Sequence, residues 1–180
     1  MTLLCYGDSN TFGFDPRSYF GSRYDPECRW VDILAAETGW EVHNNSMNGR
    51  EIPKREVQIP GSTDLLVLML GTNDLLQGAS PQETARRMEQ FLNVLSLDRA
   101  KILLIAPPPM KRGEWVPDDA LIQSSIDLAA AYGALSAKLG VHFANAGDWN
   151  VEIAFDGVHF TESGHKAFAK ALLDHIKKHL

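Results

Sequence analysis

Three residues of the sequence have the types that together make a serine hydroxyl reactive. Ser9 follows Gly7 and Asp8 near the start of the chain, and Asp156 stands three residues before His159 near its end. A serine hydroxyl is a poor nucleophile at neutral pH, but an imidazole beside it can take its proton and return it later. A carboxylate can hold that imidazole in the required tautomer. We therefore predict acyl transfer with Ser9 as nucleophile, His159 as base and Asp156 as its partner.

Acyl transfer also needs hydrogen-bond donors aimed at the oxygen that becomes negative when the carbonyl is attacked. Three such donors are available: the backbone amide of Ser9, the backbone amide of Gly49 and the side-chain amide of Asn73. We predict that these groups form an oxyanion hole, provided that the fold brings them together.

Each of these residues also has an ordinary structural interpretation. The Gly-Asp-Ser turn and Asn73 can cap helices or form turns, and Gly49 can simply supply a positive φ. Asp156 and His159 can pair in a surface loop or bind a metal, for which His165 is the one nearby third ligand. Because His165 fits better at the start of the last helix, we expect no metal site.

The segments between these residues alternate between strand-like and helix-like periodicity. Short apolar runs, two of them nearly continuous, predict strands at residues 2–6, 41–44, 64–70, 101–106 and 141–144. Helices are expected from 25 to 39, from 80 onward, over 119–139 and from 162 to the end of the chain. The helix signals are Asp25-Pro26, the capping box from Ser80 to Glu83, and the stops at Gly39 and Gly140.

This alternation predicts an α/β fold: one domain over residues 1–180, built as a three-layer α/β/α sandwich on a five-stranded parallel, flavodoxin-like sheet. The carboxyl ends of parallel strands lie at the same edge of a sheet, which is where open α/β folds bind ligands. Ser9, Gly49, Asn73 and His159 all follow predicted strands, so we expect them to meet at that edge.

Four sequence blocks carry a resemblance to a known family. They read YGDSNTFG from Tyr6, NSMNGR from Asn45, LGTND from Leu70 and DGVHFT from Asp156. In this order, across nearly the whole chain, they resemble the SGNH hydrolase superfamily, also called the GDSL esterase/lipase family. The first block has Asn10 where the family name has leucine, a departure that leaves substrate preference open.

The resemblance implies a serine ester hydrolase, an enzyme that cleaves carboxylic esters. Carried over residue by residue, it implies that Ser9, Asp156 and His159 form the catalytic triad, and that Gly49 and Asn73 complete the oxyanion hole with Ser9. The residues of the first two blocks, GDSNTFG and NGR, look closest to those of the bacterial arylesterase-like and acyltransferase-like branch. Some members of that branch form homo-oligomers, so the resemblance leaves a homo-oligomer open here.

Aromatic residues in two predicted loops are candidates for the substrate-binding wall. We single out Phe12, after the nucleophile, and Trp115, after the fourth strand, as residues that would face a small acyl or aryl group. The first loop also contains Phe14, Tyr19, Phe20 and Tyr24, and any of these aromatics can equally be a core or interface residue.

Three functions remain open from the sequence. The first is an esterase acting on small acyl or aryl esters. The second is an acyltransferase or deacetylase that uses the same acyl-enzyme, and the third is a non-catalytic ligand-binding module. The chain shows no lid or long apolar helix that would favour a true lipase.

Composition limits the partners. The chain has 180 residues, 44% of them hydrophobic, a formal net charge of −6 and two cysteines. It has no basic stripe for nucleic acid, no apolar run long enough for a membrane span, and no signal peptide pattern. It also lacks a P-loop and a dinucleotide fingerprint, so we expect no cofactor. The expected partner is a small ester, and the expected location is the cytoplasm.

Overall fold

A parallel sheet organises the chain. In the computed structural model, which describes residues 1–18 and 20–180, five strands form this sheet in the order β2-β1-β3-β4-β5. The strands are β1 (Thr2–Gly7), β2 (Glu41–Ser46), β3 (Leu65–Met69), β4 (Ile102–Ala106) and β5 (His142–Asn145). All pairings between neighbouring strands are parallel. The predicted five-stranded parallel sheet is confirmed.

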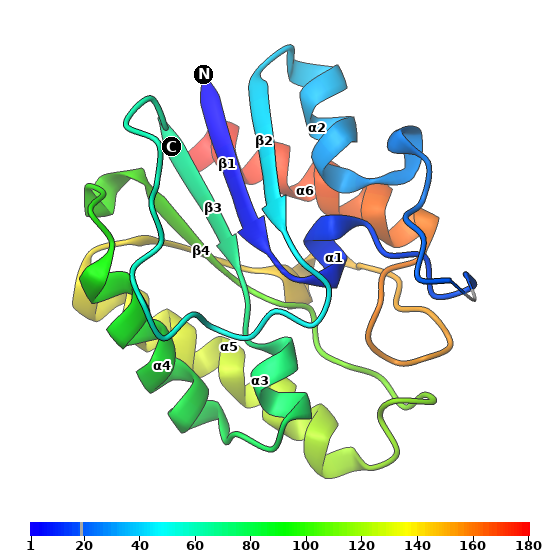
Figure 1. Ribbon diagram of the computed structural model, residues 1–180. Coiled ribbons are helices and arrows are strands. Elements are labelled where there is room, and N and C mark those ends of the chain that lie inside the picture. Colours follow the sequence, from blue (N-terminus) through cyan, green and yellow to red (C-terminus); the bar gives the residue numbers. More distant parts are fainter. Residues whose placement is uncertain (19) are drawn as a thin grey trace.

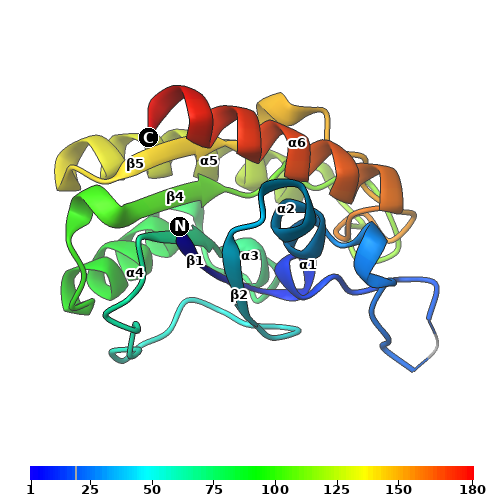
Figure 2. The same cartoon turned by 90° about the horizontal axis from the view of Figure 1, so that it is seen from above.

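Helices cover both faces of this sheet (Figure 1). The α-helices are α1 (Ser9–Phe12), α2 (Trp30–Thr38), α3 (Thr72–Leu76), α4 (Pro81–Val94), α5 (Asp119–Leu139) and α6 (Glu162–His179). Three short 3₁₀ helices are η1 (Pro26–Cys28), η2 (Arg99–Lys101) and η3 (Ala146–Trp149). Helices α3, α4 and α5 lie on one face, and α2 and α6 lie side by side on the other (Figures 1 and 2).

The helix predicted from residue 25 to residue 39 was wrong over residues 25–29. Residues Pro26–Cys28 form a 3₁₀ turn, Arg29 is extended, and α2 begins only at Trp30. Asp25 makes no capping hydrogen bond with its side chain. The break allows Trp30 to be buried and to donate its indole N–H to the Asn10 carbonyl oxygen at 3.0 Å. Tertiary packing here overrides a local start signal.

The other predicted helix boundaries agree with the structure. Ser80 Oγ accepts a hydrogen bond from Glu83 N at 3.1 Å and starts α4, but the Glu83 carboxylate binds Arg86 and Arg87. Helices α2 and α5 end at Gly39 and Gly140, both in the left-handed conformation. The last helix begins at Glu162, as predicted, and the Thr161 side chain caps it.

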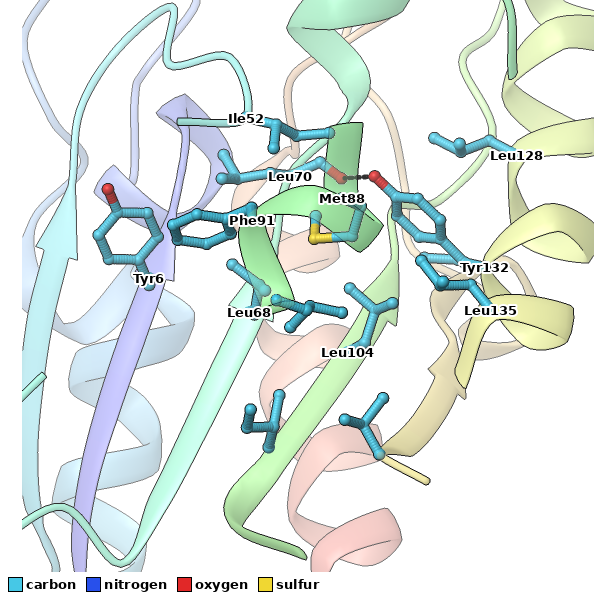
Figure 3. Packing of buried hydrophobic residues seen from close by; sticks show 14 of the residues in the cluster. Tyr6, Ile52, Leu68, Leu70, Met88, Phe91, Leu104, Leu128, Tyr132 and Leu135 are labelled. Carbon is cyan, nitrogen blue, oxygen red and sulfur yellow. Dashed lines mark hydrogen bonds between the residues drawn. The ribbon is translucent and has the colours of Figure 1, made fainter. Parts of the chain in front are cut away.

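The buried strands contribute side chains to two separate hydrophobic clusters. Alternate residues point to opposite faces of a strand, so Leu66 and Leu68 of β3 join the cluster under α4 and α5 (Figure 3). Val67 and Met69 join the cluster under α2 and α6. The near-continuous apolar runs of β3 and β4 therefore serve both faces, which is what a sheet covered on both sides requires.

Two glycines allow the strands to turn directly into short helices at the carboxyl edge. A side chain on Gly7 would collide with the Thr11 hydroxyl. Gly71, after β3, has a φ of +123° and would place a Cβ 2.7 Å from the Tyr132 hydroxyl. As a result α1 and α3 start immediately at the ends of β1 and β3 (Figure 1).

Within the described ranges, no helix is long and apolar enough to cross a membrane.

Candidate active site

Ser9 is held at the junction of β1 and α1. It is the first residue of α1, and Asp8 caps this helix by accepting a hydrogen bond from Asn10 N at 3.0 Å. The helix has a single turn and stops at Gly13, which is left-handed. Both Asp8 and Ser9 are buried. The serine is therefore presented at the carboxyl edge of the sheet on a short, rigid support.

His159 connects Ser9 to Asp156. Its Nε2 lies 2.9 Å from Ser9 Oγ, and its Nδ1 lies 2.6 Å from Asp156 Oδ2. The other carboxylate oxygen, Oδ1, accepts the backbone amides of Val158 at 2.9 Å and His159 at 3.0 Å. All three side chains are buried. Residues 150 positions apart in sequence thus form one continuous hydrogen-bonded chain.

The surroundings of Asp156 keep it ionised. Burial acts to raise its pKa, but the hydrogen bonds from the His159 ring and from the His159 and Val158 amides outweigh burial and lower the pKa below the usual value. An ionised Asp156 accepts a proton-bearing Nδ1. Nε2 is then the ring nitrogen with a free lone pair, and it can accept the hydroxyl proton of Ser9.

A second loop fixes the segment that carries this pair. Trp115 N donates to the Asp156 carbonyl oxygen at 2.9 Å, and Lys111 N donates to the Gly157 carbonyl oxygen at 3.0 Å. Gly157 has a φ of +87°, and a Cβ there would collide with the Lys111 carbonyl oxygen. Residues 107–117, predicted to be a loop at this edge, therefore support the loop that carries Asp156 and His159.

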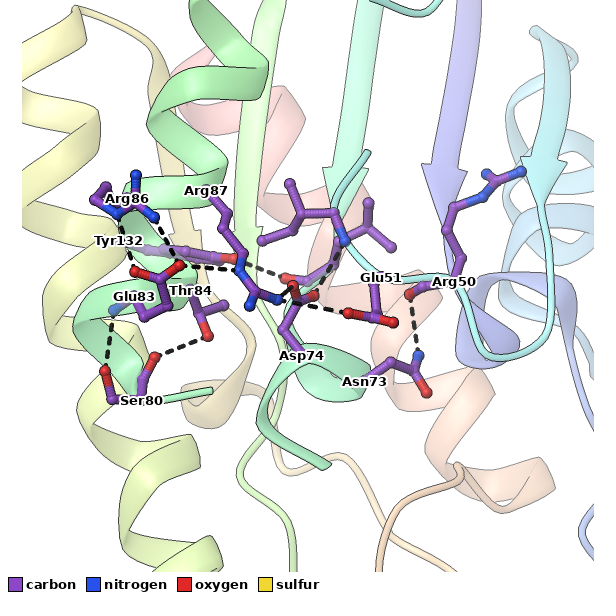
Figure 4. Close-up of polar contacts among 12 residues, drawn as sticks. Arg50, Glu51, Asn73, Asp74, Ser80, Glu83, Thr84, Arg86, Arg87 and Tyr132 are labelled. Carbon is purple, nitrogen blue, oxygen red and sulfur yellow. Dashed lines mark hydrogen bonds and ion pairs between the residues drawn. The ribbon is translucent and has the colours of Figure 1, made fainter. Parts of the chain in front are cut away.

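Asn73 lies in the first turn of α3 and contacts two neighbouring segments of the site, of which Figure 4 shows the one with Arg50. Its Nδ2 donates to the Arg50 carbonyl oxygen at 3.1 Å and lies 3.5 Å from Asp8 Oδ2. Gly49, one residue before Arg50, has a φ of +71° and no atom within 4 Å of a Cβ built on it. Asn73 thus connects the segment with Ser9 to the segment with Gly49.

Asp74 also holds the loop that carries Gly49, between β2 and β3. Its buried carboxylate accepts Ile52 N at 3.0 Å and Arg87 Nη1 at 2.9 Å (Figure 4). Burial raises its pKa, against the lowering effect of Arg87. Consecutive residues of α3 therefore anchor the loop that carries Gly49 at two points.

The aromatic residues predicted near the substrate are placed differently from one another. The Trp115 ring stands edge-on to His159 with centroids 5.1 Å apart, and half of the residue is exposed. Phe12 instead lies against Arg23, whose guanidinium is 4.4 Å from the ring centroid. Phe14, which we did not single out, has its ring 4.5 Å from His159. Tyr19 lies outside the described residues.

His165 does not join Asp156 and His159. It lies in the first turn of α6, buried against the rings of Tyr24 and Phe160. Burial is the main cause that lowers its pKa to about 3, so it stays neutral. Among the described residues, no group of three or more His, Cys, Asp or Glu side chains is arranged to hold a metal ion.

Asn10, at which the sequence left only substrate preference open, lies within the site and contacts the segment that carries His159. Its side chain bonds to the backbone on both sides of His159, at Val158 and Phe160. The available signal was a polar amide at a motif position where the family name has leucine, next to a buried strand.

A linked serine, histidine and aspartate at the carboxyl edge of this five-stranded parallel sheet defines a protein of the SGNH hydrolase fold. The model of the GDSL-like Lipase/Acylhydrolase family matches residues 5–167. The chain belongs to this family and is a carboxylic ester hydrolase.

Solved structures agree over the whole chain. A suspected arylesterase from Agrobacterium tumefaciens str. C58 is 30% identical, with 99% of each chain covered and a TM-score of 0.81. The aryl esterase of M. smegmatis is 27% identical, again over 99% of each chain, with a TM-score of 0.82. A carbohydrate acetylesterase from Sinorhizobium meliloti is 25% identical over 99% of each chain, with a TM-score of 0.79. No curated protein matches the chain in sequence.

Proposed function

We propose that this protein is a serine esterase that hydrolyses small acyl or aryl esters through an acyl-enzyme on Ser9. The observation that carries the proposal is the continuous chain from Ser9 Oγ through His159 to Asp156, with distances of 2.9 and 2.6 Å. Both distances are those of hydrogen bonds across which a proton can move.

In the first step Ser9 Oγ bonds to the ester carbonyl carbon while His159 Nε2 takes the hydroxyl proton. The imidazolium that forms is stabilised by Asp156. The tetrahedral intermediate then collapses, the bond to the alkoxy oxygen breaks, and His159 gives its proton to the leaving alcohol. His159 Nε2 then takes a proton from water while the water oxygen bonds to the acyl carbon. As the bond between this carbon and Ser9 Oγ breaks, His159 gives the proton to Oγ, which releases the acid and free Ser9.

The oxyanion would be stabilised by the Ser9 amide, the Gly49 amide and Asn73. The Ser9 amide belongs to the first turn of α1, where backbone N–H groups lack partners within the helix. Asn73 Nδ2 carries two hydrogens, of which one is used at 3.1 Å by Arg50. The other hydrogen faces only Asp8 Oδ2 at 3.5 Å, so it is available to a developing negative charge.

Substrate size follows from the rings around His159. The rings of Phe14 and Trp115 both contact the imidazole of His159 and offer apolar surface beside the reacting atoms. The similar solved structures include two proteins described as arylesterases and a carbohydrate acetylesterase. Small acyl groups, acetyl above all, are the substrates we expect, on either an aryl or a sugar alcohol.

The test is hydrolysis of p-nitrophenyl esters of increasing acyl length by the wild type, Ser9→Ala and Ser96→Ala. Ser96 is an exposed serine whose hydroxyl donates to Glu56, so its variant controls for loss of a serine as such. We expect Ser9→Ala to lose at least about 10³-fold in kcat, Ser96→Ala to be unchanged, and wild-type turnover to fall with acyl length.

Covalent labelling makes the test specific to one atom. A fluorophosphonate should modify the peptide that contains Ser9, and added alcohol in the ester assay would reveal acyl transfer in place of hydrolysis. A folded Ser9→Ala protein with undiminished turnover would refute the proposal.

A further inference from the structure

We propose that Asn10 is a positioning residue that sets the distance between His159 and Ser9. This inference rests on the proposed function, because it takes Ser9 and His159 as the reacting pair. It concerns a residue whose side chain touches neither reacting atom. Its effect on turnover would therefore pass through the placement of His159.

The Asn10 side chain binds the backbone immediately before and after His159. Its Nδ2 donates to the Val158 carbonyl oxygen at 3.1 Å, and its Oδ1 accepts Phe160 N at 2.9 Å. One side-chain amide thus makes the pair of bonds that a neighbouring strand's peptide would make. Asn10 is 4% exposed, so water does not compete for these bonds.

The backbone of Asn10 is itself fixed. Its N–H donates to Asp8 Oδ1 at 3.0 Å, and its carbonyl oxygen accepts the Trp30 indole N–H at 3.0 Å. Ser9 precedes it in the same single-turn helix. The side chain therefore bonds the loop around His159 directly to the helix that presents the nucleophile.

Asp156 cannot set this distance. It is three residues from His159, in the same loop, and every hydrogen bond that joins the two lies within that loop. Asp156 therefore orients the ring, whereas Asn10 fixes where the loop stands relative to Ser9. A leucine at this position would have neither the donor nor the acceptor.

The first experiment compares Asn10→Ala with a matched control in the same helix. Thr11 is also buried, but its hydroxyl has no hydrogen-bond partner among the described residues, so Thr11→Val removes a polar group that holds nothing. We expect Asn10→Ala to lower kcat by roughly 10- to 100-fold with KM within about twofold, because small displacements of catalytic groups are costly. Thr11→Val should keep kcat within about twofold.

The second experiment separates positioning from a general structural effect. Asn10→Ala is made in a His159→Ala background, and the residual hydrolysis of an activated aryl ester is measured. If Asn10 acts through His159, adding Asn10→Ala should leave the residual rate within about twofold. A loss of the same factor in both backgrounds would overturn the proposal, as would an unchanged kcat for Asn10→Ala alone.

One further variant keeps the outcomes distinct. If Asn10→Ala does not fold, Asn10→Asp keeps the side-chain size and the acceptor for Phe160 N but loses the donor to Val158, and its kcat is expected to fall with KM retained. An Asn10→Asp enzyme with wild-type kcat would also overturn the proposal. Failure of the proposed function would appear elsewhere, as full activity in Ser9→Ala.

Discussion

Two buried carboxylates near Ser9 and His159 differ in what surrounds them. Asp156 is held ionised because hydrogen bonds from His159 and Val158 outweigh its burial. Asp8, one residue before Ser9, has its pKa raised to about 6, because burial outweighs the hydrogen bond from Asn10 and the favourable charges of His159 and Arg50. Two aspartates near each other therefore have pKa values shifted in opposite directions, because their surroundings differ.

The raised pKa of Asp8 predicts a pH-dependent stability. The pKa of Asp8 is about 6 in the folded protein, whereas in the unfolded chain it has the ordinary value of 3.8. Between these values the folded state binds more protons, so the free energy of unfolding falls as pH rises through this window. Asp8→Asn removes the charge, and its stability relative to the wild type should rise by about 3 kcal/mol or less over the same window.

Urea unfolding of both proteins at pH 4 and pH 7.5 measures this difference. The comparison within each pH cancels the contributions of all other titrating groups. A stability difference that is the same at both pH values would show that Asp8 ionises as freely in the fold as outside it.

At the level of elements, α3 is short but determines the position of the loop after β2. Asn73 and Asp74 bond to Arg50 and Ile52 of that loop, and Arg87 of α4 completes a buried ion pair with Asp74. The loop makes no regular structure of its own between β2 and β3. Its conformation near Gly49 therefore depends on these side-chain bonds.

We predict that Asp74→Ala will both destabilise the protein and slow it. The variant leaves Ile52 N without its acceptor and takes from Arg87 its buried partner, at a cost of about 3 kcal/mol. Turnover should fall in addition, because the loop with Gly49 loses an anchor. Chemical denaturation and ester hydrolysis measure the two effects.

Glu51→Ala is the matched control for this prediction. Glu51 also pairs with Arg87, at 3.5 Å, but it is partly exposed, so its removal should cost under about 1 kcal/mol. Equal destabilisation by the two variants would mean that the buried ion pair contributes no more than the surface pair.

At the level of the whole molecule, one sheet joins two hydrophobic clusters. Leu104 of β4 belongs to the cluster under α4 and α5, while Leu103 and Ile105 of the same strand belong to the other. Unfolding of this strand would therefore remove side chains from both clusters at once. The two halves of the core are therefore expected to unfold together.

This coupling predicts the behaviour of Leu104→Ala. The substitution should cost about 2–5 kcal/mol, because it opens a cavity at a fully buried site. Three tryptophans, Trp30, Trp40 and Trp149, pack on the opposite cluster. The midpoint of urea unfolding followed by their fluorescence should nevertheless fall to a lower urea concentration, together with the midpoint followed by far-UV circular dichroism. A fluorescence transition that stays at its wild-type midpoint would show that the clusters unfold independently.

The sequence by itself determined the five strands and the order of the chemical groups along the chain. Apolar runs identified the strands, and the glycine signal at Gly140 placed the end of the helix over 119–139. Because parallel strands end at one edge, the sequence also predicted that the segments with Ser9 and His159 meet there. These features are local, or follow from the connection rules of α/β folds.

Only the tertiary structure decided which side chains meet across that edge. In the folded protein Phe14 rather than Phe12 lies beside His159. Helix α2 begins at Trp30, and the Asn10 side chain bonds to the backbone around His159. The physical reason is that burial and packing set these contacts between segments up to 150 residues apart. A side chain such as Asn10 has the same local preferences whether it caps a turn or bridges two loops, and only the packed fold provides its partners.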